Sequence, residues 1–209
     1  MKALRPLLLQ GFLALTAGMS SAGAQAGNQQ YEPLAASVQA ALHAAVADQA
    51  PLDPSFQRSP ERARWLAEMS QRLARRIPDE TARSELLRAV HYEATRAGLD
   101  PQLVLGLIQV ESGFKKYALS TAGARGYMQV MPFWTKLIGN EESNLFHMRT
   151  NLRFGCTILR HYLDIEKGDL FRALGRYNGS LGKAEYPNLV RAAWERNWSC
   201  PANLRLAQN

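Results

Sequence analysis

The residue best suited to acid–base chemistry is Glu111, which ends the most apolar run of the chain. The sequence LVLGLIQVES, from Leu103 to Ser112, is apolar nearly all round, which is typical of a helix buried in the centre of a domain. Burial against apolar walls disfavours the charged form of a carboxyl group and raises its pKa, so such an acid can protonate a leaving oxygen. A glutamate at the end of a helix can also simply face water. Periodicity alone leaves both interpretations open.

The residues after Glu111 carry a long and specific motif. The segment from Glu111 to Pro132, ESGFKKYALSTAGARGYMQVMP, resembles the signature of the soluble lytic transglycosylase catalytic domain, whose fold is related to goose-type lysozyme. A second block, RYNGS at residues 176–180, is similar to the Tyr-Asn-Ala/Gly-Gly motif of that family, with Ser180 in place of the usual small residue. The resemblance extends over residues 86–190 and does not cover the chain before Ala82.

The resemblance implies a role for each matching position. Glu111 matches the family's general acid and base. The other matches are Ser120 and Tyr177 as support for this acid, and Met128, Gln129 and Asn178 as residues that bind the sugar. Four of these five also have a structural interpretation: a turn hydroxyl for Ser120, a core tyrosine for Tyr177, an amide that satisfies backbone groups for Gln129, and a turn cap for Asn178.

A single matching carboxyl group indicates which reaction to expect. Most glycosidases use two carboxyl groups, whereas the family resemblance assigns only Glu111 here. A lytic transglycosylase needs no second one, because the muramyl 6-hydroxyl of the substrate attacks intramolecularly and closes a 1,6-anhydro ring. We therefore predict non-hydrolytic cleavage of the MurNAc-GlcNAc β-1,4 bond in peptidoglycan. Two alternatives stay open: a hydrolytic, lysozyme-like muramidase, and an inactive wall-binding component of an export apparatus.

The start of the chain has the layout of a secretory signal peptide. Lys2 and Arg5 precede an apolar run, and small residues follow it as far as Ala24. That run is shorter than the ~20 apolar residues of a membrane span, and no later segment reaches this length. We therefore expect a signal peptide over residues 1–24 and a periplasmic or exported protein without a membrane span.

Export also bears on the two cysteines, Cys156 and Cys200. An exported chain meets an oxidising compartment in which two cysteines can pair. We predict one disulfide between them, and two buried thiols are the alternative.

Composition limits the ligands and partners. The formal charge of +7 suits a solvated surface and attracts polyanions such as nucleic acid, anionic lipid headgroups or a cell wall, and the signal peptide argues against nucleic acid. The family resemblance implies peptidoglycan glycan strands as the partner. The four histidines are dispersed and no phosphate-binding loop is present, so we expect no metal and no cofactor. An association with a cell-envelope assembly stays open.

The elements that must position these residues are predicted to be helices. Ser59, Asp79 and Asp100 have the side-chain type of helix N-caps, and a proline follows both Ser59 and Asp100. The glycine-rich residues 112–126 predict a loop with short extended pairing. Helical patterns resume at residues 128–138, 152–165, 170–177 and 183–194. The predicted fold class is mainly α: a lysozyme-like, multi-helix catalytic domain over residues 82–209, preceded by a short helical extension or linker over residues 25–81.

Overall fold

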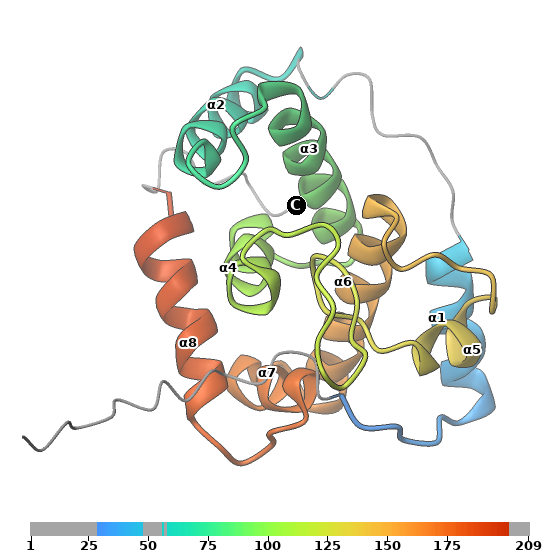
Figure 1. Ribbon diagram of the computed structural model, residues 1–209. Coiled ribbons are helices and arrows are strands. Elements are labelled where there is room, and N and C mark those ends of the chain that lie inside the picture. Colours follow the sequence, from blue (N-terminus) through green and yellow to red (C-terminus); the bar gives the residue numbers. More distant parts are fainter. Residues whose placement is uncertain (1–28, 48–55, 57, 201–209) are drawn as a thin grey trace, which may run out of the picture.

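The computed structural model describes residues 29–47, 56 and 58–200. The signal peptide predicted over residues 1–24 lies outside this part. The described chain folds into the helices labelled in Figure 1, which are α1 (Ala36–Ala47), α2 (Pro60–Leu73), α3 (Glu80–Arg96), α4 (Pro101–Ser112), α5 (Phe133–Ile138), α6 (Met148–Ile165), α7 (Leu170–Asn178), α8 (Glu185–Ala193) and the π-helix η2 (Trp194–Trp198). Extended pairing among these residues is limited to two isolated bridges, so the predicted mainly α class is confirmed.

Helix α4 occupies the centre of the molecule. Figure 1 shows α3, α6, α7 and α8 around it, and α4 packs against α3, α8 and η2. Leu105, Leu107 and Ile108 of α4 are completely buried, as the apolar run predicts. The helix ends at Gly113, whose φ of 57° is left-handed, a conformation that glycine adopts without steric cost. Glu111 is therefore held in the last turn of a central helix.

The helix N-caps are those that the sequence predicts. Ser59 accepts a hydrogen bond from the N–H of Arg62, Asp79 accepts one from Ala82, and Asp100 accepts one from Gln102. Each cap satisfies a backbone donor that the first turn of a helix leaves without an intrahelical partner. These local bonds fix the starts of α2, α3 and α4.

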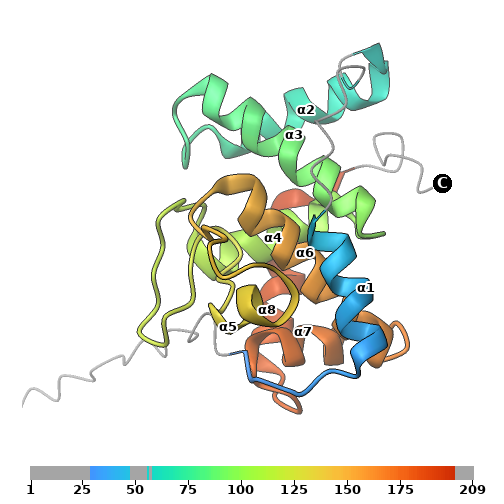
Figure 2. The same cartoon turned by 90° about the vertical axis from the view of Figure 1, so that its right-hand side faces the viewer.

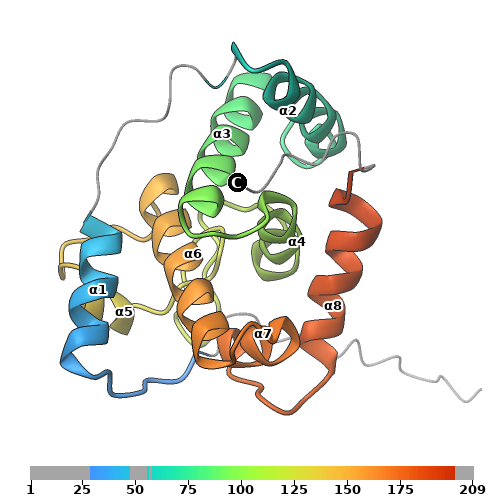
Figure 3. The ribbon, with the colours of Figure 1, turned by 180° about the vertical axis from the view of Figure 1, so that it is seen from behind.

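The N-terminal helix packs on the same body as the helices that follow it. Helix α1 contacts α5 and α6, and Figure 3 shows it beside them. Gln39 donates to the carbonyl oxygen of Leu137 at 2.7 Å, and His43 donates to that of Ile138 at 3.1 Å. Both bonds satisfy carbonyl groups at the C-terminal end of α5, where intrahelical donors run out.

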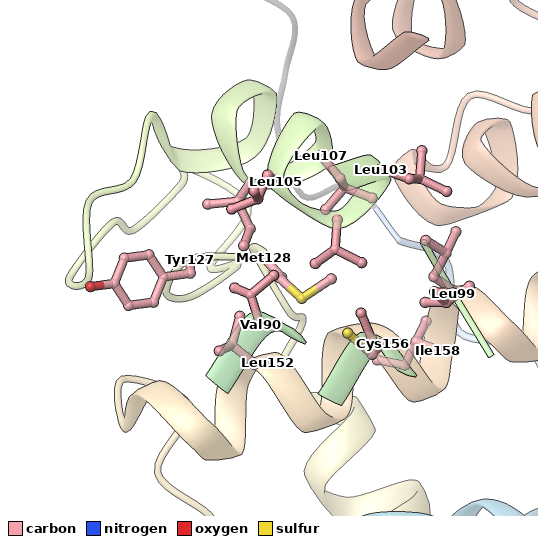
Figure 4. Close-up of a cluster of buried hydrophobic side chains, with 14 of the residues drawn as sticks. Val90, Leu99, Leu103, Leu105, Leu107, Tyr127, Met128, Leu152, Cys156 and Ile158 are labelled. Carbon is pink, nitrogen blue, oxygen red and sulfur yellow. The ribbon is translucent and has the colours of Figure 1, made fainter. Parts of the chain in front are cut away.

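A buried apolar cluster joins α3, α4 and α6. Figure 4 shows its members, which include Val90, Leu105, Leu107, Met128, Leu152, Cys156 and Ile158. Met128 comes from the loop between α4 and α5, and its side chain is completely buried against Gly155 of α6. Any Cβ atom at position 155 would overlap Met128, so glycine is what lets this loop pack directly onto α6.

The predicted disulfide is absent, and that prediction was wrong. Cys156 and Cys200 are both buried and are not joined. Cys156 lies in α6, which packs against α3 and α7, whereas Cys200 follows η2, which packs against α4 and α8. The two cysteines are therefore carried by elements with different packing partners. Burial raises the pKa of the Cys156 thiol far above its usual range, so this thiol stays protonated.

None of the described helices combines the length and the apolar character that crossing a membrane requires.

Candidate active site

Glu111 is buried and directly hydrogen-bonded to a tyrosine of a neighbouring helix. Its exposed fraction is 5%, and the hydroxyl of Tyr186 donates a hydrogen bond to its Oε1 atom. Tyr186 lies in the first turn of α8, which packs along α4. Burial, and then the charge of Glu111 and this hydrogen bond, raise the pKa of Tyr186 well above its ordinary value. The phenol therefore stays protonated and holds one carboxyl oxygen in place.

A glycine of α4 makes this contact between helices achievable. A Cβ atom at Gly106 would lie 2.9 Å from both the Cβ and the backbone N of Trp194, at the junction of α8 and η2. Such a contact is too short for any side chain, so only glycine lets the two helices approach this closely. The spacing between Glu111 and Tyr186 depends on that approach.

Tyr177, predicted to support the acid, lies near Glu111. Its side chain is completely buried in α7, and its hydroxyl donates to the carbonyl oxygen of Met128 at 2.8 Å. Burial raises the pKa of Tyr177 well above its ordinary value, and the charge of Glu111 raises it further. The second effect requires the two groups to be close, because charges act weakly over long distances. The sequence motif thus brings Tyr177 to the acid, with its hydroxyl directed to the motif loop.

The loop between α4 and α5, residues 113–132, is fixed by side chains that the sequence did not single out. We call it the motif loop. Ser112 donates to the carbonyl oxygen of Tyr127 at 2.7 Å, which ties the loop to the end of α4. Asn151 of α6 donates to the carbonyl oxygen of Arg125 at 2.7 Å and accepts from the N–H of Met128 at 2.8 Å. In the sequence, the one signal that could have pointed to Asn151 is its position as a polar residue within an otherwise apolar helical stripe.

Two of the predicted site residues serve the loop or the core. The hydroxyl of Ser120 accepts from the N–H of Ala124 at 3.0 Å, which closes a turn within the motif loop. Met128, predicted to bind sugar, packs its side chain in the core and exposes none of it. The placement of Ser120 agrees with its structural interpretation as a turn hydroxyl.

Gln129 and Asn178, the two amide side chains predicted to bind sugar, differ in how many of their hydrogen-bonding atoms are already engaged. Gln129 is 2% exposed with a left-handed φ of 47°, and its side chain donates to the carbonyl oxygens of Gly126 at 2.9 Å and Ala118 at 3.2 Å. Asn178 donates to the hydroxyl of Ser180 at 3.0 Å, but its buried Oδ1 atom accepts no hydrogen bond within the described part of the chain. The Oδ1 atom of Asn178 is thus a buried acceptor whose hydrogen-bonding capacity the described residues do not use.

Glu93 is a second buried carboxyl group, and its surroundings give it a different role. It is completely buried and forms ion pairs with Arg153 at 3.0 Å and with Arg96 at 3.1 Å, and Arg149 lies 3.8 Å away. Three guanidinium groups engage this carboxyl group, which suits a structural anchor. The carboxyl group of Glu111 accepts a hydrogen bond from the phenol of Tyr186.

No group of three or more His, Cys, Asp or Glu side chains within the described residues is placed to hold a metal ion.

One protein-family model matches the part of the chain that contains this site. The model of the family "Transglycosylase SLT domain" matches residues 88–193, which is more than half of the chain and includes Glu111, the motif loop, Tyr177 and Tyr186. The chain belongs to this family. In its SLT domain the two sequence motifs are in contact through Tyr177 and Met128. Tyr186, which belongs to neither motif, donates to Glu111.

Curated relatives of this SLT domain are transglycosylases. The chain is 38% identical over 88 residues to the transglycosylase of Enterobacteria phage PRD1, which covers 42% of this chain and 32% of the relative. It is 43% identical over 119 residues to the membrane-bound lytic murein transglycosylase C of Haemophilus influenzae (strain PittEE), which covers 49% of this chain and 33% of the relative. The chain thus spans about a third of the length of these relatives.

Solved structures similar to the SLT domain carry matching names. One is the lytic transglycosylase Slt of Pseudomonas aeruginosa, determined as an inactive mutant, with a TM-score of 0.40 and 25% identity, covering 52% of this chain and 18% of the other. Another is the 70-kDa soluble lytic transglycosylase of Escherichia coli, with a TM-score of 0.36 and 18% identity, covering 72% of this chain and 32% of the other.

Proposed function

We propose that this protein is a peptidoglycan lytic transglycosylase in which Glu111 is the sole general acid and base. It cleaves the MurNAc-GlcNAc β-1,4 bond and leaves a 1,6-anhydromuramyl end. The observation that carries the proposal is the buried pair of Glu111 and Tyr186 inside the matched SLT domain. A buried carboxyl group that is oriented by a hydrogen-bond donor can exchange a proton with the substrate.

The reaction needs two proton transfers, one from Glu111 and one back to it. Because Oε1 of Glu111 accepts from Tyr186, we place the exchangeable proton on Oε2. Glu111 gives this proton to the bridging oxygen, which leaves as the hydroxyl of GlcNAc, while the substrate's own acetamido group stabilises the cationic sugar carbon. Glu111 then takes a proton from the muramyl 6-hydroxyl, whose oxygen closes the anhydro ring. The ring closure is intramolecular, and this removes the need for a second protein carboxyl group.

The remaining site residues act around this pair in the proposal. Tyr177 supports the acid by holding the motif loop through Met128, and Gln129 and Ser120 keep the same loop in shape. Asn178 offers its Oδ1 atom to a sugar hydroxyl or amide. We further propose that the protein acts in the periplasm or beyond, after export through the signal peptide.

Mass analysis of digested sacculi tests this function. Purified sacculi are treated with the wild type, with Glu111→Gln and, as a matched control, with Glu142→Gln, which alters an exposed carboxyl group. We expect anhydromuropeptides from the wild type and the control and none from Glu111→Gln. Reducing ends without anhydro products would show hydrolysis. Binding to sacculi without any product from the wild type would show a wall-binding protein.

A further inference from the structure

A glutamine from outside the matched family region enters the candidate active site. Gln29 precedes α1, far from residues 88–193, yet it is only 4% exposed. Its Oε1 atom accepts from the N–H of Met131 at 3.2 Å, and its Nε2 atom donates to the carbonyl oxygen of Gln129 at 3.4 Å. Its amide also lowers the pKa of Tyr177, against the larger effect of burial. A primary amide has an acceptor oxygen and two donor hydrogens, so the two backbone partners engage both ends of the group.

The partners of Gln29 are the groups that surround Glu111. Gln29 binds the motif loop directly at residues 129 and 131. Next to them, the hydroxyl of Tyr177 in α7 donates to the carbonyl oxygen of Met128. The charge of Glu111 acts on the same tyrosine, so the link reaches the environment of the acid.

The residues after Gln29 fasten the segment on both sides. Glu32 forms an ion pair with Arg176 of α7 at 3.1 Å, and the ring of Tyr31 meets that of Phe133 edge-on at 5.8 Å. Figures 1 and 2 show this segment, in blue, beginning beside α7 and the motif loop before it turns into α1. Gln29 is thus held in place by neighbours and does not depend on its own bonds alone.

We propose that Gln29 is a positioning residue for the transglycosylase reaction. It holds Tyr177 and the backbone of residues 128–131 in the arrangement that Glu111 requires, so the N-terminal segment completes a site that the family region alone leaves open. The inference rests on the proposed function. An inhibitory segment that keeps substrate out would make the same contacts, but its removal would have the opposite effect on the rate.

The test uses the full chain and soluble peptidoglycan glycan strands. Gln29→Ala removes the side chain, and Gln29→Met keeps its length but removes the amide. Gln30→Ala changes an exposed neighbour and is the control. We measure kcat and KM for the release of anhydro ends, together with Tm. We expect kcat to fall roughly 10- to 100-fold in both Gln29 variants, because small misplacements of catalytic groups cost this much. KM should change little, and Gln30→Ala should match the wild type.

Three outcomes would overturn the inference. Gln29→Met with the kcat of the wild type would show that the amide does not position the site. A lower Tm, together with an unchanged kcat measured at a temperature below that Tm, would show that Gln29 has only a structural role. A higher rate would show that the segment inhibits. Failure of the proposed function is read separately, from the wild-type sample, which would then yield no anhydro ends.

Discussion

Removing the hydroxyl of Tyr186 should slow the reaction without disturbing the fold. Tyr186→Phe deletes one oxygen and keeps the ring, which is 2% exposed between α4 and α8. The lost hydrogen bond joins the phenol to Glu111 in a site from which water is largely excluded. A hydrogen bond to a charged group contributes about 1.5–3 kcal/mol. If the transition state loses this whole contribution, kcat falls about 10- to 150-fold, at 1.36 kcal/mol for each factor of ten.

The assay compares kcat and KM for anhydro-end formation in the wild type and Tyr186→Phe. The matched control is Tyr117→Phe, which removes the same atom from a side chain that is 71% exposed. We expect the control to behave as the wild type and Tyr186→Phe to lose kcat with nearly unchanged KM. A kcat within about twofold of the wild type would refute the orienting role, because it corresponds to less than about 0.5 kcal/mol.

Two further predictions concern stability. Burial, with a smaller effect of Arg62, lowers the pKa of His91 to about 4 from its ordinary 6.5. Between these two pKa values the unfolded chain binds a proton at His91 and the folded chain does not. The free energy of unfolding should therefore fall by about 3 kcal/mol between pH 7 and pH 4 through this group. Urea unfolding of His91→Gln should show a correspondingly shallower pH dependence, and an unchanged slope would contradict the burial argument. Gly106→Ala should lower the free energy of unfolding by about 1–3 kcal/mol, because the new Cβ atom would lie 2.9 Å from Trp194. Alanine normally stabilises a helix relative to glycine, so a stabilised variant in the same urea experiment would show that α8 shifts freely away from α4.

The sequence predicted the features that depend on neighbouring residues. The N-caps Ser59, Asp79 and Asp100 were confirmed, because a cap needs only a side chain and a backbone N–H two or three positions later. The central position of α4 was also confirmed, since a helix that is apolar on every side must be covered on every side. The loop over residues 112–126 with short pairing was confirmed by the bridge between Leu119 and Arg125.

The largest error in a predicted helix start concerns α5. Residues 128–138 were predicted to be helical, but α5 begins at Phe133. Val130 instead pairs with Arg125, and Gln129 adopts a left-handed conformation. The apolar spacing of Met128 and Met131 is compatible with a helix, but both positions are used by contacts with distant segments. A helical periodicity in a short apolar run does not distinguish the two cases.

The roles of two residues depended on contacts that no local pattern encodes. Tyr186 is an ordinary tyrosine near the start of a predicted helix, and it becomes important only because α8 packs on α4. Gln29 lies in a segment that looked like a linker, and its partners are in the motif loop and α7. The failed disulfide has the same origin, because the spacing of Cys156 and Cys200 says nothing about the packing partners of the elements that carry them.

The candidate site joins segments that are far apart along the chain, and this affects when activity can arise during folding. Tyr186 and Glu111 are separated by 75 positions, and Gln29 and Gln129 by 100. Individual helices form within microseconds, whereas contacts between distant segments form later, because closing long loops costs entropy. A chain emerging from the ribosome therefore has the carboxyl group of Glu111 before it has the phenol that orients it. Cleavage activity should accordingly be among the last properties to recover on refolding, after the helices themselves have formed.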